Sequence, residues 1–364
     1  MSKYNIMKKV LFLFIVMIIY HRYQAQNTVT FNVNNINTEI TNNLSPFYNS
    51  IDEVSSYQVG NGNFPVFKTG LTVLAKDEDS LYISSHGLRG IDNYGYGPIS
   101  EDYNTLDFER YNKVWKVTSH EIWSHQQGLG TSNSILTWPA HGDVANGEAF
   151  YLAPFVDVNG DGVYNPLLGD YPKIKGDEAV YYIVNDKKPA HISFYKQSIG
   201  IEIHVMMYSY VSNKAIVNNT TFVNYSIYNR SSIDFLEFYV SSYLDADLNC
   251  PYNDFHGCDT TRNSIFTFEG NITSTNPGEN CIDTVVKKSA IALKLLNHPL
   301  SSSFYSHIGT FSVQNGNTLT ITNAERVYNL MNGLYVLGQD KISFIDSNLT
   351  KFITPNGSSE LNLL

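Results

Sequence analysis

Apolar side chains recur at every second position through much of the second half of the chain, and this period of two restricts the fold more than any other feature. Leu236, Phe238, Val240 and Leu244 occupy alternate positions that only Ser242 interrupts. In an extended chain, alternate side chains point to the same face of a sheet. We therefore predict that this segment is a half-buried β-strand.

Comparable segments recur at short intervals. They cover residues 201–211, 221–228, 265–268, 290–296 and 318–321. Turn-forming sequences separate them, for example Asn-Arg-Ser at 229–231 and Asn-Pro-Gly at 276–278. The pattern predicts an all-β protein, built as an antiparallel β-sandwich with little helix. One helix is predicted, from the N-cap Asn323 to about Gly333.

Length and composition indicate an ordered chain of one large or two medium domains. Of the 364 residues 43% are hydrophobic and only 16% are charged, so the apolar surface is sufficient to offset the entropy lost on folding. We expect a signal segment (1–25), a β-rich N-terminal module (26–178) and a β-sandwich module (179–364). The weaker periodicity of residues 26–119 is compatible with a separate module or with the first strands of the same sandwich.

The N-terminus has the three parts of a secretory signal. The basic pair Lys8-Lys9 precedes an apolar run at 10–20, and a polar stretch with Ala25 follows. The alternative is a membrane anchor, but a spanning helix needs about 20 apolar residues and this run stops at His21. We therefore predict cleavage near Ala25, export to the outer cell surface or the medium, and no transmembrane segment in the mature chain.

The acidic balance of the chain limits its partners. The formal net charge is −10, and removal of the four basic residues among the first 25 would take it to −14. Such a surface repels phosphate backbones, and no Lys/Arg cluster interrupts it, so the sequence excludes nucleic-acid binding. Cys250, Cys258 and Cys281 would form one disulfide and leave one thiol in an oxidising compartment, and the sequence does not choose the pair.

The sharpest local signal is Asp-Val-Asn-Gly-Asp-Gly-Val-Tyr-Asn at residues 157–165. Oxygen ligands at alternate positions around a turn glycine are typical of a Ca²⁺-binding loop, because calcium takes six to eight oxygens. The expected ligands are the side chains of Asp157, Asn159, Asp161 and Asn165 and the carbonyl of Val163.

The end of this loop departs from that of a calcium sensor. A sensor places a bidentate Glu at position 12, where this chain has Leu168, and Pro166 disfavours an exiting helix. Asp170 is the candidate that would complete the shell. We predict a structural Ca²⁺ loop of extracellular type, with a Kd of about 10⁻⁴ to 10⁻³ M. The alternative is an Asx-rich turn that binds nothing.

A second acidic cluster is a weaker candidate for a cation site, and a solvated turn is its alternative. It comprises Asp245, Asp247, Asn249, Asp254 and Asp259. Cys250 and Cys258 bracket Asp254 and would be able to pin this loop by a disulfide.

No catalytic motif is present. His120 and His125 of His-Glu-Ile-Trp-Ser-His are five residues apart, which puts them roughly 140° apart on a helix rather than on one zinc-binding face. His141 and Asp143 would suit a metal or acid–base pair, although a turn explains them as well. The sequence does not exclude a pair of carboxylates for sugar hydrolysis, because such partners meet in space and not in sequence.

Several segments together resemble a family of large secreted and cell-surface proteins of Bacteroidota. The matching segments are 97–99, 111–118, 138–143, 152–162, 169–172, 176–177, 185–186, 229–231 and 257–259. Many members carry a C-terminal sorting domain for the type IX secretion system, and no pattern of such a domain is evident after residue 345. The resemblance implies export and a role at the cell surface or in the medium.

These features lead to one functional hypothesis and one alternative. The chain is expected to be an exported, calcium-stabilised, non-catalytic protein that acts in adhesion or as a scaffold, with a cell-surface, matrix or glycan partner. The alternative is a secreted hydrolase or glycan-binding module with a cleft lined by Tyr and Asp.

Overall fold

The computed structural model describes residues 28–49, 54–60, 63–86, 94–187, 198–248, 254–269 and 289–301, with shorter pieces between 310 and 343. The expected signal segment (1–25) lies outside this part. The predicted helix at 323–333 also lies largely outside it, and its two described residues, Tyr328 and Met331, are helical. No described helix is long and apolar enough to cross a membrane.

The described chain is all-β, with antiparallel sheets and three short α-helices, as the alternating pattern predicted. It divides into two compact units made of interleaved segments. Unit 1 comprises residues 1–46, 96–185 and 202–228, and unit 2 comprises 47–95, 186–201 and 229–364. The expected boundary at residue 178 therefore falls inside unit 1.

The main sheet of unit 1 explains this difference. Strand β12 (Glu178–Asn185) pairs on one side with β13 (Ile201–Ser209) and on the other with β9 (Trp115–Thr118). β14 (Phe222–Asn229) continues the sheet beyond β13, and the short helix α4 (Ala215–Asn218) lies between these two strands in sequence. β12 therefore hydrogen-bonds to strands from before and after residue 178, and the segments on both sides of this position share one sheet.

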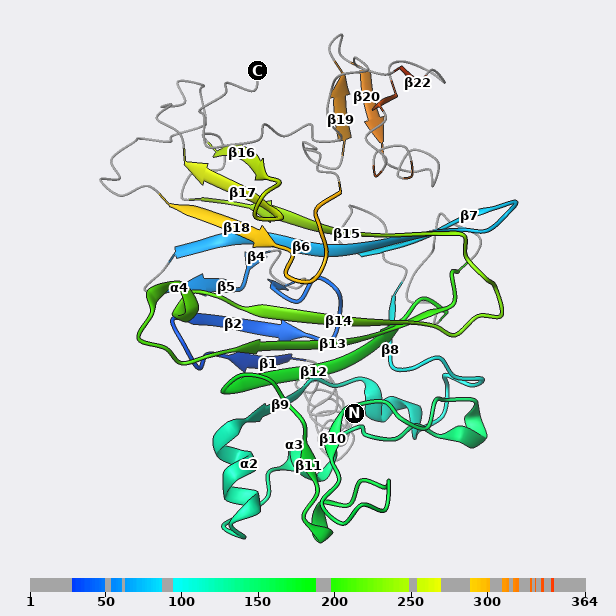
Figure 1. Ribbon diagram of the computed structural model, residues 1–364, viewed down its shortest axis with the longest axis vertical. Helices are drawn as coiled ribbons and strands as arrows, with labels where there is room; N and C mark the ends of the chain where they lie inside the picture. Colours follow the sequence, from blue (N-terminus) through cyan, green and yellow to red (C-terminus); the bar gives the residue numbers. More distant parts are fainter. Residues whose placement is uncertain are drawn as a thin grey trace, which may run out of the picture. The chain divides into compact units, whose positions relative to one another are not determined.

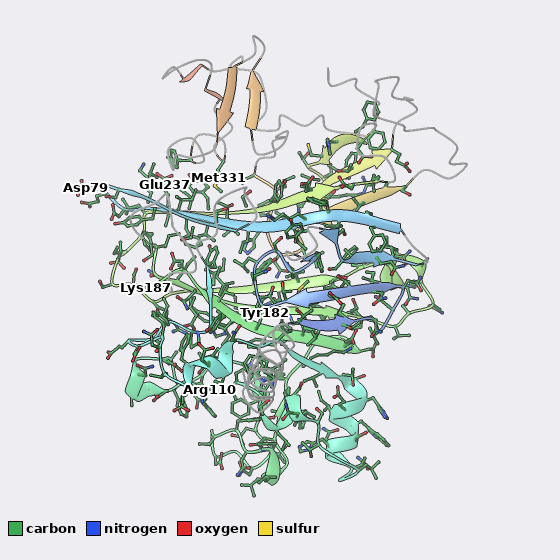
Figure 2. All side chains as sticks on the ribbon, turned by 180° about the vertical axis from the view of Figure 1, so that it is seen from behind. Asp79, Arg110, Tyr182, Lys187, Glu237 and Met331 are labelled. Carbon is green, nitrogen blue, oxygen red and sulfur yellow. The ribbon has the colours of Figure 1, made fainter. Side chains whose placement is uncertain are left out.

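Both faces of β12 are covered, and all eight of its residues are buried. Tyr181 and Ile183 pack into a cluster with Trp115 and Trp138. Tyr182, which lies between them in sequence and is labelled in Figure 2, points to the other face. Its hydroxyl donates to the carbonyl of Asn43 at 2.8 Å. Full burial of each such side chain stabilises the fold by about 1.5–3 kcal/mol. Because β12 is also paired along both edges, it is the central strand of the unit.

A layer of loops and short elements covers one side of this sheet, and we call residues 97–114 and 119–177 the loop layer (Figure 1). Its elements are η1 (Phe108–Tyr111), α2 (Ser119–Gln126), α3 (Asn133–Leu136), η2 (Val144–Asn146), β10 (Phe155–Val156), η3 (Pro166–Leu168) and β11 (Tyr171–Pro172). The hairpin of β1 (Thr28–Phe31) and β2 (Ile36–Thr41) also belongs to unit 1. β8 (Gly95–Tyr96) leads into the loop layer.

Unit 2 is organised around the long strand β6 (Asn63–Lys76). β6 pairs with β5 (Tyr57–Val59), β7 (Leu81–His86) and β15 (Glu237–Ala246). A separate meander consists of β16 (Asp254–Asp259), β17 (Ser264–Glu269) and β18 (Ala290–Lys294). The remaining pairs are β3 (Tyr48–Asn49) with β4 (Val54–Ser55), β19 (Thr310–Val313) with β20 (Asn317–Thr320), and β21 (Tyr335–Val336) with β22 (Ile342–Ser343).

The alternation that predicted β15 locates the strand but not its covered face. Leu236, Phe238 and Val240 are 68%, 42% and 50% exposed. The opposite face carries Glu237 and Tyr239, and Tyr328 covers it with an edge-to-face ring contact and a hydroxyl hydrogen bond. Among the described strands β15 pairs only with β6, so it is an edge strand.

Candidate functional site

The predicted Ca²⁺ loop is a closed hairpin loop of the loop layer. β10 and β11 pair antiparallel, with Phe155 opposite Pro172 and Val156 opposite Tyr171. The two ends of the loop at residues 157–170 therefore lie next to each other. The loop is held at its base by backbone pairing, which fixes where its side chains lie.

Inside the loop, the Asx side chains fold the backbone by accepting its own N–H groups. Asp157 accepts from Gly160 through Oδ1 and from Gly162 through Oδ2, both at 2.7 Å. Asn159 Oδ1 accepts from the N–H of Asp161 at 3.1 Å. Gly160 and Gly162 have φ values of +77° and +80°, in the left-handed region that favours glycine. These contacts explain the Asp-x-Asn-Gly-Asp-Gly spacing in physical terms.

Two further contacts complete this turn and hold its charge. Asp161 accepts from the N–H of Val163 at 2.8 Å through Oδ1 and from the Asn159 side-chain amide at 2.8 Å through Oδ2. The hydrogen bond from the Gly162 N–H lowers the pKa of Asp157 below its usual range. The Asp157 carboxylate therefore stays ionised at neutral pH.

Asp170 supports the loop from within. Its side chain is fully buried and accepts from the N–H of Val158 and of Asn165, both at 2.8 Å. Its carbonyl lies 3.1 Å from Nε2 of His125 on α2. Asn165 caps η3 by accepting from the N–H of Leu167. Asp170 thus joins the two sides of the loop, and its predicted role as a cation ligand stays a prediction.

The oxygen chemistry of the loop suits calcium, but its carboxylates do not by themselves form a metal centre. Within the described residues, no group of three or more His, Cys, Asp or Glu side chains is placed to hold a metal ion. Bound Ca²⁺ would have to draw on the Asn159 amide oxygen and the Val163 carbonyl besides Asp157 and Asp161. Neutral oxygens of this kind are ordinary calcium ligands in proteins.

The second acidic cluster is only partly brought together. Asp254 and Asp259 are at opposite ends of β16, five residue steps or about 16 Å apart, so the two cannot ligate one ion. Asp259 pairs with Arg262 instead. Asp245 accepts from the Tyr243 hydroxyl at 3.1 Å, and Asn249 lies outside the described residues.

Asp254 is in an unusual environment. Burial, aided by the nearby carboxylates of Glu269 and Asp247, raises its pKa to about 7, against the hydrogen bond from the Leu248 N–H. Its Oδ1 is buried and has no hydrogen-bond partner among the described residues. Burial, followed by the charge of Asp245, also raises the pKa of Asp247. This end of β16 is therefore acidic and poorly solvated.

The histidine motifs have structural roles. Glu121 and Thr118 form a capping box at the start of α2, and the ring of His120 stacks on Trp123. Asp143 accepts from the N–H of Ala145 and caps η2, which agrees with the turn interpretation of the His-Gly-Asp segment. Both ring nitrogens of His141 hydrogen-bond to backbone groups.

The predicted disulfide stays a prediction, because Cys258 is buried but Cys250 and Cys281 lie outside the described residues.

A buried network in the loop layer could not be predicted from the sequence. The hydroxyl of Tyr111 donates to Oε2 of Glu148 at 2.6 Å, and the N–H of Asp143 donates to the same oxygen at 2.7 Å. Arg110, labelled in Figure 2, lies 3.7 Å from that oxygen and donates to the Tyr111 hydroxyl. Burial raises the pKa of Tyr111. Tyr111 and Glu148 are 37 residues apart, so no local pattern connects them.

Comparisons with family models, curated proteins and solved structures found no match.

Proposed function

We propose that this chain is an exported, non-catalytic protein of the cell surface or medium that acts in adhesion or as a scaffold, with Ca²⁺ stabilising its loop layer. The observation that carries the proposal is the closed loop at 157–170. Its alternating oxygen side chains and left-handed glycines wrap the backbone in the manner that calcium loops need. Export is supported by the N-terminal signal pattern and by the resemblance to secreted Bacteroidota proteins.

A non-catalytic role is supported by how the loop layer uses its polar side chains. Glu121 and Asp143 cap helices, His141 joins two backbone segments, and Glu148 is buried under Tyr111. These groups hold the loops in one arrangement. A rigid surface loop layer on a sheet is the usual construction of a binding surface.

Calcium binding is tested by titrating Ca²⁺ into the mature chain and following heat and thermal unfolding. With a Kd of about 10⁻⁴ to 10⁻³ M, 5 mM Ca²⁺ should stabilise the fold by about 1–2 kcal/mol, or a few degrees in Tm. The variant Asp157→Ala/Asp161→Ala should lose this gain. Asp161→Asn keeps the acceptor for Val163 but removes the charge and the acceptor for the Asn159 amide, so it should weaken Ca²⁺ binding with a smaller effect on the loop than the double variant.

Asp107→Ala is the matched control, because Asp107 is exposed in the same layer and its side chain caps nothing. It should respond to Ca²⁺ as the unmodified protein does. If the unmodified chain shows no heat of binding and no Tm shift, the calcium part of the proposal is wrong.

Mass spectrometry of the exported protein tests the predicted cleavage near Ala25.

The second candidate is a glycan-binding module or secreted hydrolase. The observation in its favour is the pair of exposed aromatic side chains, Phe150 and Tyr151, beside the acidic loop. A polysaccharide screen separates the cases: turnover that is abolished by Asp143→Asn indicates a hydrolase, and binding without turnover indicates a glycan-binding module.

A further inference from the structure

Six large apolar side chains are exposed on the loop layer around the closed loop. We call them the loop patch: Phe150, Tyr151, Val158, Val163, Leu167 and Leu168. Tyr151 is 62% exposed and Leu167 is 85% exposed. Single exposed apolar residues are ordinary, but a group of this size within one loop and the neighbouring segment is typical of a surface that another molecule covers.

The two segments that carry the patch lie side by side. The hydroxyl of Tyr151 is 3.3 Å from the position that a β-carbon on Gly162 would take. The ring of His141 stacks on Phe150 with centroids 4.3 Å apart, and its Nε2 accepts from the backbone N–H of Tyr164. Residues 150–151 therefore lie beside the part of the loop at residues 162–164.

This surface is held in place before any partner binds. The loop backbone is fixed by side-chain acceptors, and Asp170 joins its two sides from within. A partner would therefore order few additional groups on this side of the interface, and ordering is one of the main costs of association.

The charge around the patch is mainly acidic, and the nearby cations are Arg110, which donates to the carbonyl of His141, and the exposed Lys173. Residues 139–172 contain five acidic residues and no Lys or Arg. Asp143 and Asp161 are exposed, and Asp157 is partly exposed. A partner with positive charge complements this surface and would be steered towards it.

The geometry favours a polypeptide over a sugar. Phe150 has one ring face covered by His141, and the rings of Phe150 and Tyr151 are inclined by 74°, so they offer no shared flat platform. Four of the six patch side chains are aliphatic and suit the apolar side chains of a protein.

From these observations we infer that the loop patch docks a cationic polypeptide segment that carries apolar side chains. The apolar side chains of the segment cover Leu167, Leu168 and Tyr151, and its Lys or Arg residues lie against the exposed aspartates. This inference deepens the proposed adhesion or scaffold role by assigning it a surface and a class of partner, and it rests on that role.

The test uses three synthetic peptides and the mature chain, with binding followed by fluorescence anisotropy. One peptide mixes Lys and Arg with Leu and Trp, the second has Glu in place of every Lys and Arg, and the third keeps the Lys residues but has Ser in place of Leu and Trp. The first should bind at least about ten-fold more tightly than the others. Its affinity should fall as NaCl rises from about 50 to about 500 mM.

Two variants test the apolar and the ionic contributions to peptide binding separately. Leu167→Ser/Leu168→Ser should weaken binding about ten-fold or more, because two apolar contacts are lost. Asp143→Asn, which keeps the cap to Ala145, should weaken binding less and reduce its salt dependence. Leu106→Ser is the control, since Leu106 is 90% exposed in the same layer but outside the patch, and it should bind unchanged.

Equal binding of all three peptides, or full binding by the Leu167→Ser/Leu168→Ser variant, would overturn the inference, as would a neutral polysaccharide that binds and displaces the first peptide. Each titration is run in Ca²⁺ and in EDTA. Stabilisation by Ca²⁺ without selective peptide binding would support the calcium proposal and overturn the docking inference. Selective peptide binding without a response to Ca²⁺ would support the docking inference and overturn the calcium proposal.

Discussion

The backbone N–H of Tyr164 donates a hydrogen bond to Nε2 of His141 at 2.8 Å, across 23 residues of sequence. Nε2 can accept only when it carries no proton, so His141 is the neutral tautomer protonated on Nδ1, which donates to the carbonyl of Phe150 at 3.1 Å. One imidazole ring therefore connects the closed loop to the segment that bears Phe150 and Tyr151.

Replacing His141 should loosen both segments together. His141→Ala removes two hydrogen bonds and a ring stack and should lower the free energy of unfolding by about 1–3 kcal/mol, measured by urea unfolding. His120→Ala, on the exposed side of α2, should change it by less than about 0.5 kcal/mol. Equal effects of the two changes would contradict the connecting role of His141.

Asp170 should matter for folding of the loop independently of any cation. Asp170→Ala leaves the N–H groups of Val158 and Asn165 without their acceptor and should destabilise the protein by about 2–4 kcal/mol in EDTA. Asp170→Asn retains one acceptor oxygen and should have a smaller effect. Limited proteolysis should cut the Ala variant within 157–169 first; cleavage at an unchanged rate would count against this role.

Two neighbouring tyrosines on β12 should respond oppositely to loss of their hydroxyls. The Tyr181 hydroxyl is buried without a partner among the described residues, so Tyr181→Phe should be neutral or stabilising by up to about 1 kcal/mol. Tyr182→Phe loses the bond to Asn43 and should cost about 1 kcal/mol. Thermal unfolding measures both, and a clear loss from Tyr181→Phe would mean that an internal water satisfies its hydroxyl.

Two titrating groups on β16 should oppose one another in acid. Burial lowers the pKa of His256 to about 4, so its contribution is present above pH 6.5 and is lost as the pH falls towards 4. Burial raises the pKa of Asp254 to about 7, so its contribution is present below about pH 4 and is lost as the pH rises through 7. The two slopes have opposite signs between pH 4 and 6.5.

Single substitutions should therefore expose a pH dependence that the unmodified chain conceals. Asp254→Asn should make the protein less stable as the pH falls from 6.5 to 4, and His256→Gln should make it more stable. Each slope is at most about 1.4 kcal/mol per pH unit, and solvent screening reduces that of Asp254. Urea unfolding in EDTA at several pH values checks this, and parallel pH curves for both variants would disprove it.

The sequence predicted those features that depend on neighbours along the chain. Alternation placed β13, β14, β15, β17 and β18, because a strand exposes its period directly in the sequence. The turn at Asp157 was equally accessible, since each acceptor meets an N–H two to five residues away.

Features that depend on contacts between distant segments could not be predicted. The cover over Tyr239 comes from Tyr328, so alternation alone could not show which face of β15 is exposed. Likewise, Asp254 and Asp259 are near in sequence, yet an extended strand holds them apart. The buried contact of Tyr111 with Glu148 and the pairing of β12 with β9 leave no local signature.

The shortness of the β10–β11 ladder has a consequence for the evolution of this surface. Two residue pairs, the buried Asp170 carboxylate and the contacts of Tyr164 with His141 and Ile135 anchor the stretch between Val156 and Tyr171. The turn at residues 157–163 is bonded mainly within itself, so its length and composition can change in evolution while the sheet keeps its register.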